Sequence, residues 1–317
     1  MCTCNGASHL AAQLESLAGQ TRLPDELVVC DDRSTDSTLE IVRRFAVEAP
    51  FHVHLHVNER RLGSTANFEQ AIRLCRGDII ALCDQDDCWL QQKLQRMEAA
   101  FDDPKVGVVF SDAEIVDALG QRTGERLWTR FGLDATQRGL VEGAAGADVL
   151  LQGCFVTGAC MAFRADFRDV VLPVPLDLPL IHDGWIAAII AAVAAIRGID
   201  EPLVLYRQHS GQQIGIPVRE KPERGARAAL RRNNAFPDQI AVAERVLQRL
   251  TSQVGRPMRP GVAARINGRI QHLHARLVLP DQPLKRVPGV VVELITGRYH
   301  RYSKGIASAA KDMLPAR

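Results

Sequence analysis

Two short apolar runs in the first third of the chain each lead directly into aspartates. Leu27–Cys30 precedes Asp31-Asp32, and Ile79–Cys83 precedes Asp84-Gln85-Asp86-Asp87. Short apolar runs bounded by polar residues are typical of buried strands, and a helical pattern follows each run here. Open α/β sheets bind ligands at the carboxyl ends of their strands. The two acidic ends therefore predict a ligand site at one edge of a sheet.

The second acidic segment is the more informative of the two. Like charges this close repel one another unless a cation or a cationic ligand lies among them. The alternative is an acidic turn that caps the next helix, here one expected from Trp89 to Phe101.

Strand and helix patterns alternate along residues 1–217. The expected strands are Met1–Cys4, Leu27–Cys30, His52–Val57, Ile79–Leu82, Val106–Phe110, Cys154–Phe163 and Leu203–Tyr206. Helical spacing follows at Leu10, Leu14 and Leu17, after Ser34–Thr38, after Leu62-Gly63, at Val149–Leu151 and from Trp185 to Ile196. This alternation predicts an α/β fold with a doubly wound, mostly parallel sheet flanked by helices.

Two segments of this region have alternative interpretations or little pattern. His52, His54 and His56 alternate with apolar residues, which favours an edge strand with a solvated face over a metal site. Residues 113–146 are rich in glycine and lack a firm period, so we expect long loops over the site.

Charge divides the chain into two regions. Residues 218–317 contain 20 Lys and Arg against 7 Asp and Glu, a net charge of +13, which leaves −11 for residues 1–217 because the whole chain carries +2. We therefore expect two regions with different partners, an acidic body (1–217) and a basic helical extension (218–317).

The extension contains four helical patterns. They are Arg224–Arg232, Ile240–Leu250, Ala263–Leu279 and Val290–Ile295. Leu273, Leu277 and Val278 form an apolar stripe with arginines on the other face. Such a helix can lie on an anionic membrane or cover a packed interior, and the pattern fits both. Nucleic-acid binding is not expected, because the basic residues lack interleaved aromatics.

Further features bear on location. No apolar run is long enough to cross a membrane, and the first residues lack a secretory signal, so we expect a cytoplasmic protein that can contact the inner membrane face peripherally. The eight cysteines lack paired metal-ligand spacing, which favours buried free thiols.

Six blocks of this sequence resemble family 2 glycosyltransferases in order and spacing, in particular the bacterial rhamnosyltransferase-like branch. They are Cys4-Asn5-Gly6, Gln13–Leu17 with Gln20-Thr21, Asp31–Thr38, Leu62-Gly63, Asn67-Phe68 and Asp84–Trp89. Arg298–Tyr302 also resembles that branch. The resemblance covers residues 1–112 clearly, weakens through 215 and is slight beyond.

The resemblance implies a GT-A fold over residues 1–217, with a nucleotide-binding half (about 1–112) and an acceptor half (about 113–217). It also implies transfer of a sugar, with inversion, from a nucleotide sugar to a hydroxyl in cell-surface polysaccharide synthesis. It implies dTDP-, UDP- or GDP-sugar donors, saccharide or lipid-linked acceptors, and Mn²⁺ or Mg²⁺ as cofactor. By motif, the nucleotide-binding residues would be Cys2, Cys4, Asn5, Asp32, Gly63, Asn67 and Asp84. The metal ligands would be Asp84, Asp86 and His209, the catalytic base Asp183, and the acceptor-binding residues Thr157, Gly158, His182 and Trp185.

The expected chemistry agrees with these roles. A diphosphate leaving group needs its charge neutralised by a hard cation, and single-step inversion needs a carboxylate that deprotonates the acceptor hydroxyl. Asp86 is the first choice for the cation, Asp84 supports it, and Asp87 would only cap the next helix. In the simpler interpretation, Asp32 and Asp183 also cap helices and His209 is a polar loop residue. The family places an aromatic residue where Cys4 stands, and Cys4 cannot stack on a base.

Two other functions fit parts of the pattern. A non-catalytic scaffold would keep the fold and bind a partner or membrane through the basic extension. A sugar nucleotidyltransferase would share the sheet and the acids, but the chain does not open with a loop rich in glycine and lysine.

Overall fold

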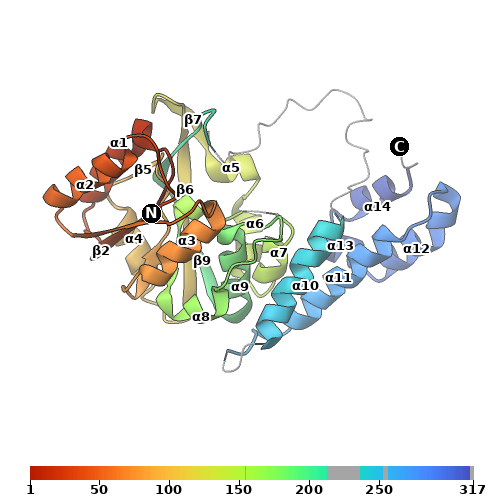
Figure 1. Ribbon diagram of the computed structural model, residues 1–317. Coiled ribbons are helices and arrows are strands. Elements are labelled where there is room, and N and C mark those ends of the chain that lie inside the picture. Colours follow the sequence, from red (N-terminus) through yellow and green to blue (C-terminus); the bar gives the residue numbers. More distant parts are fainter. Residues whose placement is uncertain (154, 213–235, 253–255, 315–317) are drawn as a thin grey trace.

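The computed structural model describes residues 1–153, 155–212, 236–252 and 256–314 (Figure 1). Its N-terminal part is a three-stranded parallel sheet in the order β1-β2-β3, formed by Cys2–Thr3, Glu26–Asp31 and His52–Val57. Helices α1 (Ala7–Ala18) and α2 (Thr38–Glu48) connect these strands. The histidine-rich β3 lies at the edge of this sheet, as predicted.

Both faces of this sheet are covered. Leu27 and Val29 of β2 belong to one apolar cluster with residues of α1 and α2, whereas Val28 and Cys30 belong to another with residues of α3 (Ser64–Leu74). Successive strand residues point to opposite faces, so the continuous apolar run reflects burial on both sides. The predicted α/β class with flanking helices is confirmed.

The second sheet has six strands and mixed directions. Its order is β4-β8-β6-β9-β5, with β7 paired to β6. The strands are Ile79–Ala81 (β4), Cys88–Trp89 (β5), Val106–Val116 (β6), Arg122–Arg126 (β7), Met161–Arg164 (β8) and Ala195–Arg207 (β9). β6 runs parallel to β9 and antiparallel to β7 and β8. The Cys2 N–H donates to the Cys83 carbonyl (3.3 Å), which joins the two sheets.

Four expectations about local structure were wrong. The strand expected over Cys154–Phe163 is confined to β8, because Gly158–Cys160 form a 3-10 helix before it. Residues 113–146 are not long loops, because β6 continues to Val116 and is followed by a polar edge strand and short helices. These elements are β7, α5 (Leu127–Phe131), α6 (Ala135–Glu142) and α7 (Gly146–Leu150). The helix expected from Trp89 begins at Lys93 (α4, Lys93–Ala100), since Cys88 and Trp89 pair with β9. The helix expected to reach Ile196 ends at Val193, because β9 begins at Ala195.

Helix α9 (His182–Val193) lies at the centre of the molecule. All of its residues except Val193 are buried, and it packs against β6, β9, α7, α8 (Arg168–Val171) and α10 (Phe236–Ser252). Helices α10 and α11 (Val262–Leu277) contribute apolar side chains to the same core. The C-terminal helices are therefore continuous with the sheet domain in packing, although the chemistry of their surface differs.

The remaining helices form the end of the molecule farthest from α1 and α2 in Figure 1. They are α12 (Pro283–Ile295), α13 (Arg298–Tyr302) and α14 (Ile306–Asp312). Three of the predicted C-terminal helices correspond to α10, α11 and α12. The fourth, Arg224–Arg232, and the predicted boundary near residue 217 lie outside the described residues. Within the described part, no helix is long and apolar enough to span a bilayer. The seven cysteines described there are free thiols.

Gly107 tests the packing of β6 on α9. A Cβ atom at this position would lie 2.6 Å from Ile190 Cγ2 and 2.8 Å from both Ala194 Cβ and Phe167 Cε2. We expect Gly107→Ala to lower the free energy of unfolding by about 1–3 kcal/mol, because the core must shift to admit the methyl group. Urea unfolding measures this change. The matched control is Gly139→Ala in α6, where no atom lies within 4 Å, and we expect it to stabilise by about 0.5–1 kcal/mol. Equal effects of the two substitutions would contradict this packing.

Candidate active site

A cavity of about 450 Å³ lies where the two sheets meet. Residues following β1, β2 and β4 line it, together with the start of α9 and the segment before β8. The predicted site residues that line this cavity are Cys2, Cys4, Asp32, Gly63, Asn67, Asp84, Asp86, Thr157, Gly158, His182 and Asp183. Side chains separated by up to about half of the chain are thus brought to one place.

The acidic segment after β4 is arranged unevenly. Burial raises the pKa of Asp84 to about 7, with further contributions from the negative charges of Asp86 and Asp183. Asp86 Oδ2 lies 2.9 Å from His209 Nε2, so the predicted pair of Asp86 and His209 is in contact, although His209 does not line the cavity.

Asp87 has a different role from the one predicted. Its Oδ1 accepts the N–H of Arg207 in β9 (2.9 Å), and the next helix begins only at Lys93. Asp87 therefore holds β9 beside the acidic segment and does not cap a helix. Its Oδ2 is buried and has no hydrogen-bond partner among the described residues, and burial raises the pKa of this carboxyl.

Asp183 enters the cavity from the first turn of α9. Its Oδ2 accepts the Gly158 N–H (2.9 Å) and its Oδ1 accepts the Gly184 N–H (2.6 Å). This acidic side chain also lies at the positive end of the helix dipole. Its neighbour His182 stacks on Phe68 with ring centroids 4.0 Å apart, and burial lowers the pKa of His182. Asp183 thus lies on the same cavity as Asp84 and Asp86, but on a separate element.

Asp32 organises the loop that leads into α3. Its Oδ1 accepts the Leu62 N–H (2.7 Å) and its Oδ2 accepts the Gly63 N–H (2.9 Å). Asn58 Nδ2 also donates to Asp32 Oδ1 (3.0 Å), and the same nitrogen donates to Asn67 Oδ1 (2.8 Å). Gly63 has φ of +79°, a conformation that glycine adopts without strain. Asp32 and Asn67 therefore shape the wall of the cavity through internal hydrogen bonds.

Besides His209, two predicted site residues lie outside the cavity lining. Asn5 is exposed, and its Oδ1 accepts the Thr35 N–H (2.8 Å), so it fastens the start of the chain to the segment after β2. Trp185 is fully buried, and its indole N–H donates to the Val171 carbonyl (2.8 Å). Because the Trp185 side chain packs inside the core, it does not face the cavity.

Several lining residues were not predicted. Gln85 hydrogen-bonds both backbone groups of Cys4, through Oε1 to the N–H (2.8 Å) and through Nε2 to the carbonyl (3.2 Å). A Cβ atom at Gly6 would lie 2.2 Å from Gln85 Oε1, so the glycine makes room for this side chain. Gly6 and Gln85 both belong to blocks that resemble family 2 glycosyltransferases, Cys4-Asn5-Gly6 and Asp84–Trp89. Their presence in these blocks was the signal that could have pointed to them. Arg61 and Tyr206 also line the cavity and carried no signal of their own.

The donor atoms fit a hard divalent cation in part. Asp84 and Asp86 offer carboxylate oxygens to the cavity, and such oxygens are the ligands that Mg²⁺ and Mn²⁺ prefer. The described residues contain no group of three His, Cys, Asp or Glu side chains already arranged around one point.

Comparison with known proteins decides the family. The model of Glycosyl transferase family 2 matches residues 1–168, which is more than half of the chain. The chain belongs to this family. The match includes the acidic segments after β2 and β4, whereas Asp183 and His209 lie beyond it.

Relatives of this chain are distant. An uncharacterized glycosyltransferase of Nostoc sp. is 26% identical over 210 residues, which are 65% of this chain and 62% of that protein. The dTDP-rhamnosyl transferase RfbG of Shigella flexneri is 31% identical over 99 residues, 30% of this chain and 34% of that protein. The chain therefore spans about 60% or less of the length of these curated relatives.

A solved structure covers nearly all of the chain. The structure of S. aureus TarS 1-349 in complex with UDP-GlcNAc superimposes with a TM-score of 0.59 at 16% identity, covering 98% of this chain and 86% of that one. At this identity the likeness establishes the fold alone. The predicted GT-A fold is confirmed.

Asp32 provides a test of the cavity wall. We expect Asp32→Ala to lower the free energy of unfolding by about 1–3 kcal/mol, because the N–H groups of Leu62 and Gly63 lose their acceptor. Urea unfolding measures the loss. Glu59→Ala, which removes an exposed carboxylate from the same loop, is the control and should change stability by about 0.5 kcal/mol or less. A loss no greater than that of the control would contradict this anchoring role.

Proposed function

We propose that this protein is an inverting glycosyltransferase that moves a sugar from a nucleoside-diphosphate donor to a hydroxyl of a saccharide or lipid-linked acceptor in cell-surface polysaccharide synthesis. One observation carries the proposal. Asp84 and Asp86 on one element and Asp183 on another line the same cavity. This separation suits a reaction in which a cation neutralises the negative charge of the leaving group and a base, on a different element, deprotonates the attacking hydroxyl.

The nucleotide would occupy the part of the cavity lined by Cys2, Cys4 and Asp32. Asp32 uses its oxygens on backbone N–H groups, yet a carboxylate has about four acceptor positions and can accept a further N–H from a base. Arg61 is exposed at the cavity and its guanidinium can pair with a phosphate. The resemblance of the flanking motifs to family 2 enzymes supports this arrangement.

A divalent cation, Mg²⁺ or Mn²⁺, would be held by Asp84 and Asp86, with His209 beside Asp86. When bound, such an ion supplies positive charge that stabilises the departing nucleoside diphosphate. Without it, the two carboxylates would repel the diphosphate. The His209 contact restrains Asp86 Oδ2 and leaves the second oxygen of that carboxylate for other partners.

Asp183 would remove the proton of the acceptor hydroxyl. The hydrogen bonds from Gly158 and Gly184 fix the carboxylate, so the oxygen that accepts the proton is held in one position. The neighbouring Thr157 and His182 line the cavity beside it and are the proposed acceptor contacts. The position at the mouth of a buried helix makes this base part of the rigid core.

The donor sugar is proposed from similarity alone. The Shigella relative is named a dTDP-rhamnosyl transferase, and the structural neighbour TarS was solved with UDP-GlcNAc. Both donors carry a pyrimidine base. We therefore propose a dTDP- or UDP-linked donor, with rhamnose as the first sugar to test.

The proposed base gives a direct test. With dTDP-rhamnose and UDP-sugars as donors, we expect Asp183→Asn to lower the rate of nucleoside-diphosphate release about 100-fold or more, because the amide cannot take up the proton. Nucleotide affinity and thermal stability should change little, since Asn can still accept the Gly158 N–H. Asp177→Asn, an exposed residue in the segment before α9, is the matched control. Full activity of Asp183→Asn would overturn the assigned role.

The cation site is tested by binding. We expect UDP or dTDP together with Mn²⁺ to raise the melting temperature of the protein more than either alone, because the ion and the diphosphate share a site. Asp86→Ala should remove this cooperation, while Asp102→Ala, an exposed residue after α4, should keep it. Cooperation that persists in Asp86→Ala would place the ion elsewhere. Absence of nucleotide binding and turnover in the wild type would favour a non-catalytic scaffold.

A further inference from the structure

Helix α12 has its apolar face on the outside of the molecule. Its exposed apolar residues recur at helical spacing along the whole length of the helix. They are Leu284, Val287, Pro288, Val291, Val292 and Ile295, here called the α12 stripe. Leu284 is 85% exposed and Ile295 is 81% exposed. Single exposed apolar residues are normal, but a continuous stripe marks a surface that is covered by something else.

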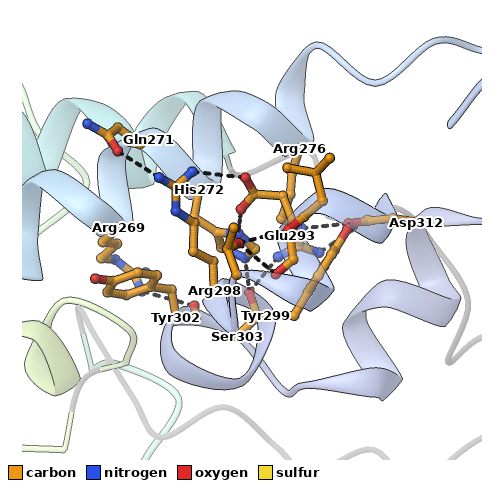
Figure 2. A network of polar contacts seen from close by, with 12 residues as sticks. Arg269, Gln271, His272, Arg276, Glu293, Arg298, Tyr299, Tyr302, Ser303 and Asp312 are labelled. Atoms are coloured by element: carbon orange, nitrogen blue, oxygen red, sulfur yellow. Dashed lines mark hydrogen bonds and ion pairs between the residues drawn. The ribbon is translucent and has the colours of Figure 1, made fainter. Parts of the chain in front are cut away.

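The inner face of α12 is charged. Arg286 is fully buried and donates to the carbonyls of Asp281 (2.8 Å) and Asp312 (2.9 Å). Glu293 accepts from Arg298 (3.0 Å) and lies 2.6 Å from Nδ1 of His272 on α11, as Figure 2 shows. These contacts fix the rotation of the helix, because turning the stripe inward would expel both charged residues from their partners. The outward direction of the stripe is therefore built into the packing.

The same network determines the surface charge. Residues 283–314 contain two acids, Glu293 and Asp312, and both are buried. Asp312 accepts from Arg276 (2.6 Å) and from the Tyr299 hydroxyl (2.7 Å). The exposed formal charges of this segment are all positive, carried by Lys285, Arg301, Lys304 and Lys311. Asp281, which is exposed just before α12, is outnumbered by these cations, and an apolar stripe with a net positive border is the composition that binds anionic lipid surfaces.

We propose that the α12 stripe docks this protein on an anionic lipid surface. The apolar side chains would enter the boundary between headgroups and acyl chains, and the lysines and arginine on α12–α14 would contact lipid phosphates. Charge favours this partner over a second copy of the chain. A two-fold interface between stripes would bring the same cations of both copies together, with Asp281 as the single exposed acid within residues 281–314 to balance them. The proposal is independent of catalysis, because lipid binding is measured without donor or acceptor.

This surface differs from the one that the sequence indicated. The apolar stripe that the sequence left open to a membrane role was on the helix that became α11. Its Leu273 is buried, and Arg269 and Arg276, three and four residues away, are buried on the same face. The exposed face of α11 is mainly polar, with Asn267, Gln271 and His274 along it. The lipid-binding role therefore moves to α12.

The test is co-sedimentation of the full chain with vesicles of phosphatidylcholine, with and without phosphatidylglycerol. We expect binding to the anionic vesicles that weakens with added salt. Leu284→Ser/Ile295→Ser should weaken the partition about tenfold or more, since both side chains are exposed and their loss removes apolar area without disturbing the fold. The matched control is Val47→Ser/Leu176→Ser, which removes exposed apolar side chains from the sheet domain, 86% and 67% exposed.

Three results would overturn the proposal. The first is no binding of the wild type to anionic vesicles. The second is equal binding by the two double variants. The third is a concentration-dependent dimer in analytical ultracentrifugation that Leu284→Ser/Ile295→Ser abolishes, which would assign the stripe to a second copy. Unchanged melting temperatures of both variants ensure that altered binding does not arise from unfolding.

Discussion

Burial of helix α9 is the interaction on which the other parts of the structure depend. Every residue from His182 to Ala192 is buried, so the helix is surrounded on all sides and cannot shift without opening the core. Its first turn carries Asp183 into the cavity, while its sides contact β6, β9 and α10. Apolar burial of this extent contributes far more to stability than any single hydrogen bond at the cavity. The position of the proposed base is consequently determined by packing.

The same principle explains how the polar groups are distributed. In the C-terminal helices, buried arginines pair with buried acids or with carbonyls, as for Arg276 with Asp312 and Arg269 with the Leu151 carbonyl (3.1 Å). Buried charges are tolerated where such partners are present. In the cavity, Asp84 and Asp87 are acids whose pKa values burial raises, and the described residues provide no compensating ion pair for either. The C-terminal network and the cavity thus differ in whether the described residues supply partners for the buried charges.

Much of this could be predicted from the sequence, where local pattern and chemistry coincide. The strands before Asp31 and Asp84 are short apolar runs, and the rule for open sheets correctly placed their carboxyl ends at one cavity. What failed depends on distant contacts. Trp89 is in a strand because β9 pairs with it, and Asp87 bonds the N–H of Arg207, which lies 120 residues away. The periodicity of apolar residues reports local structure and cannot reveal either of these long-range contacts.

The apolar stripes show the same limit more sharply. Periodicity identifies an amphipathic helix but not which face is turned inward. On α11 the arginines were expected outside, yet Arg269 and Arg276 are buried because carbonyls and Asp312 accept their N–H groups. On α12 the charged Arg286 and Glu293 again face inward with Val290, whereas Val287, Val291 and Val292 face outward. Only the positions of the partners decide between these cases.

The two regions of opposite charge constrain how the molecule could lie on a membrane. Residues 1–217 carry a net charge of −11 and residues 218–317 carry +13. With α12 on an anionic surface, the acidic sheet domain would be repelled while the basic helices are attracted. Helices α1 and α2 lie at the opposite end from α12 in Figure 1. The protein would then stand on its C-terminal helices, with the sheet domain held away from the lipid. A nucleotide donor would approach from solution, and a lipid-linked acceptor would have to extend from the surface to reach Asp183.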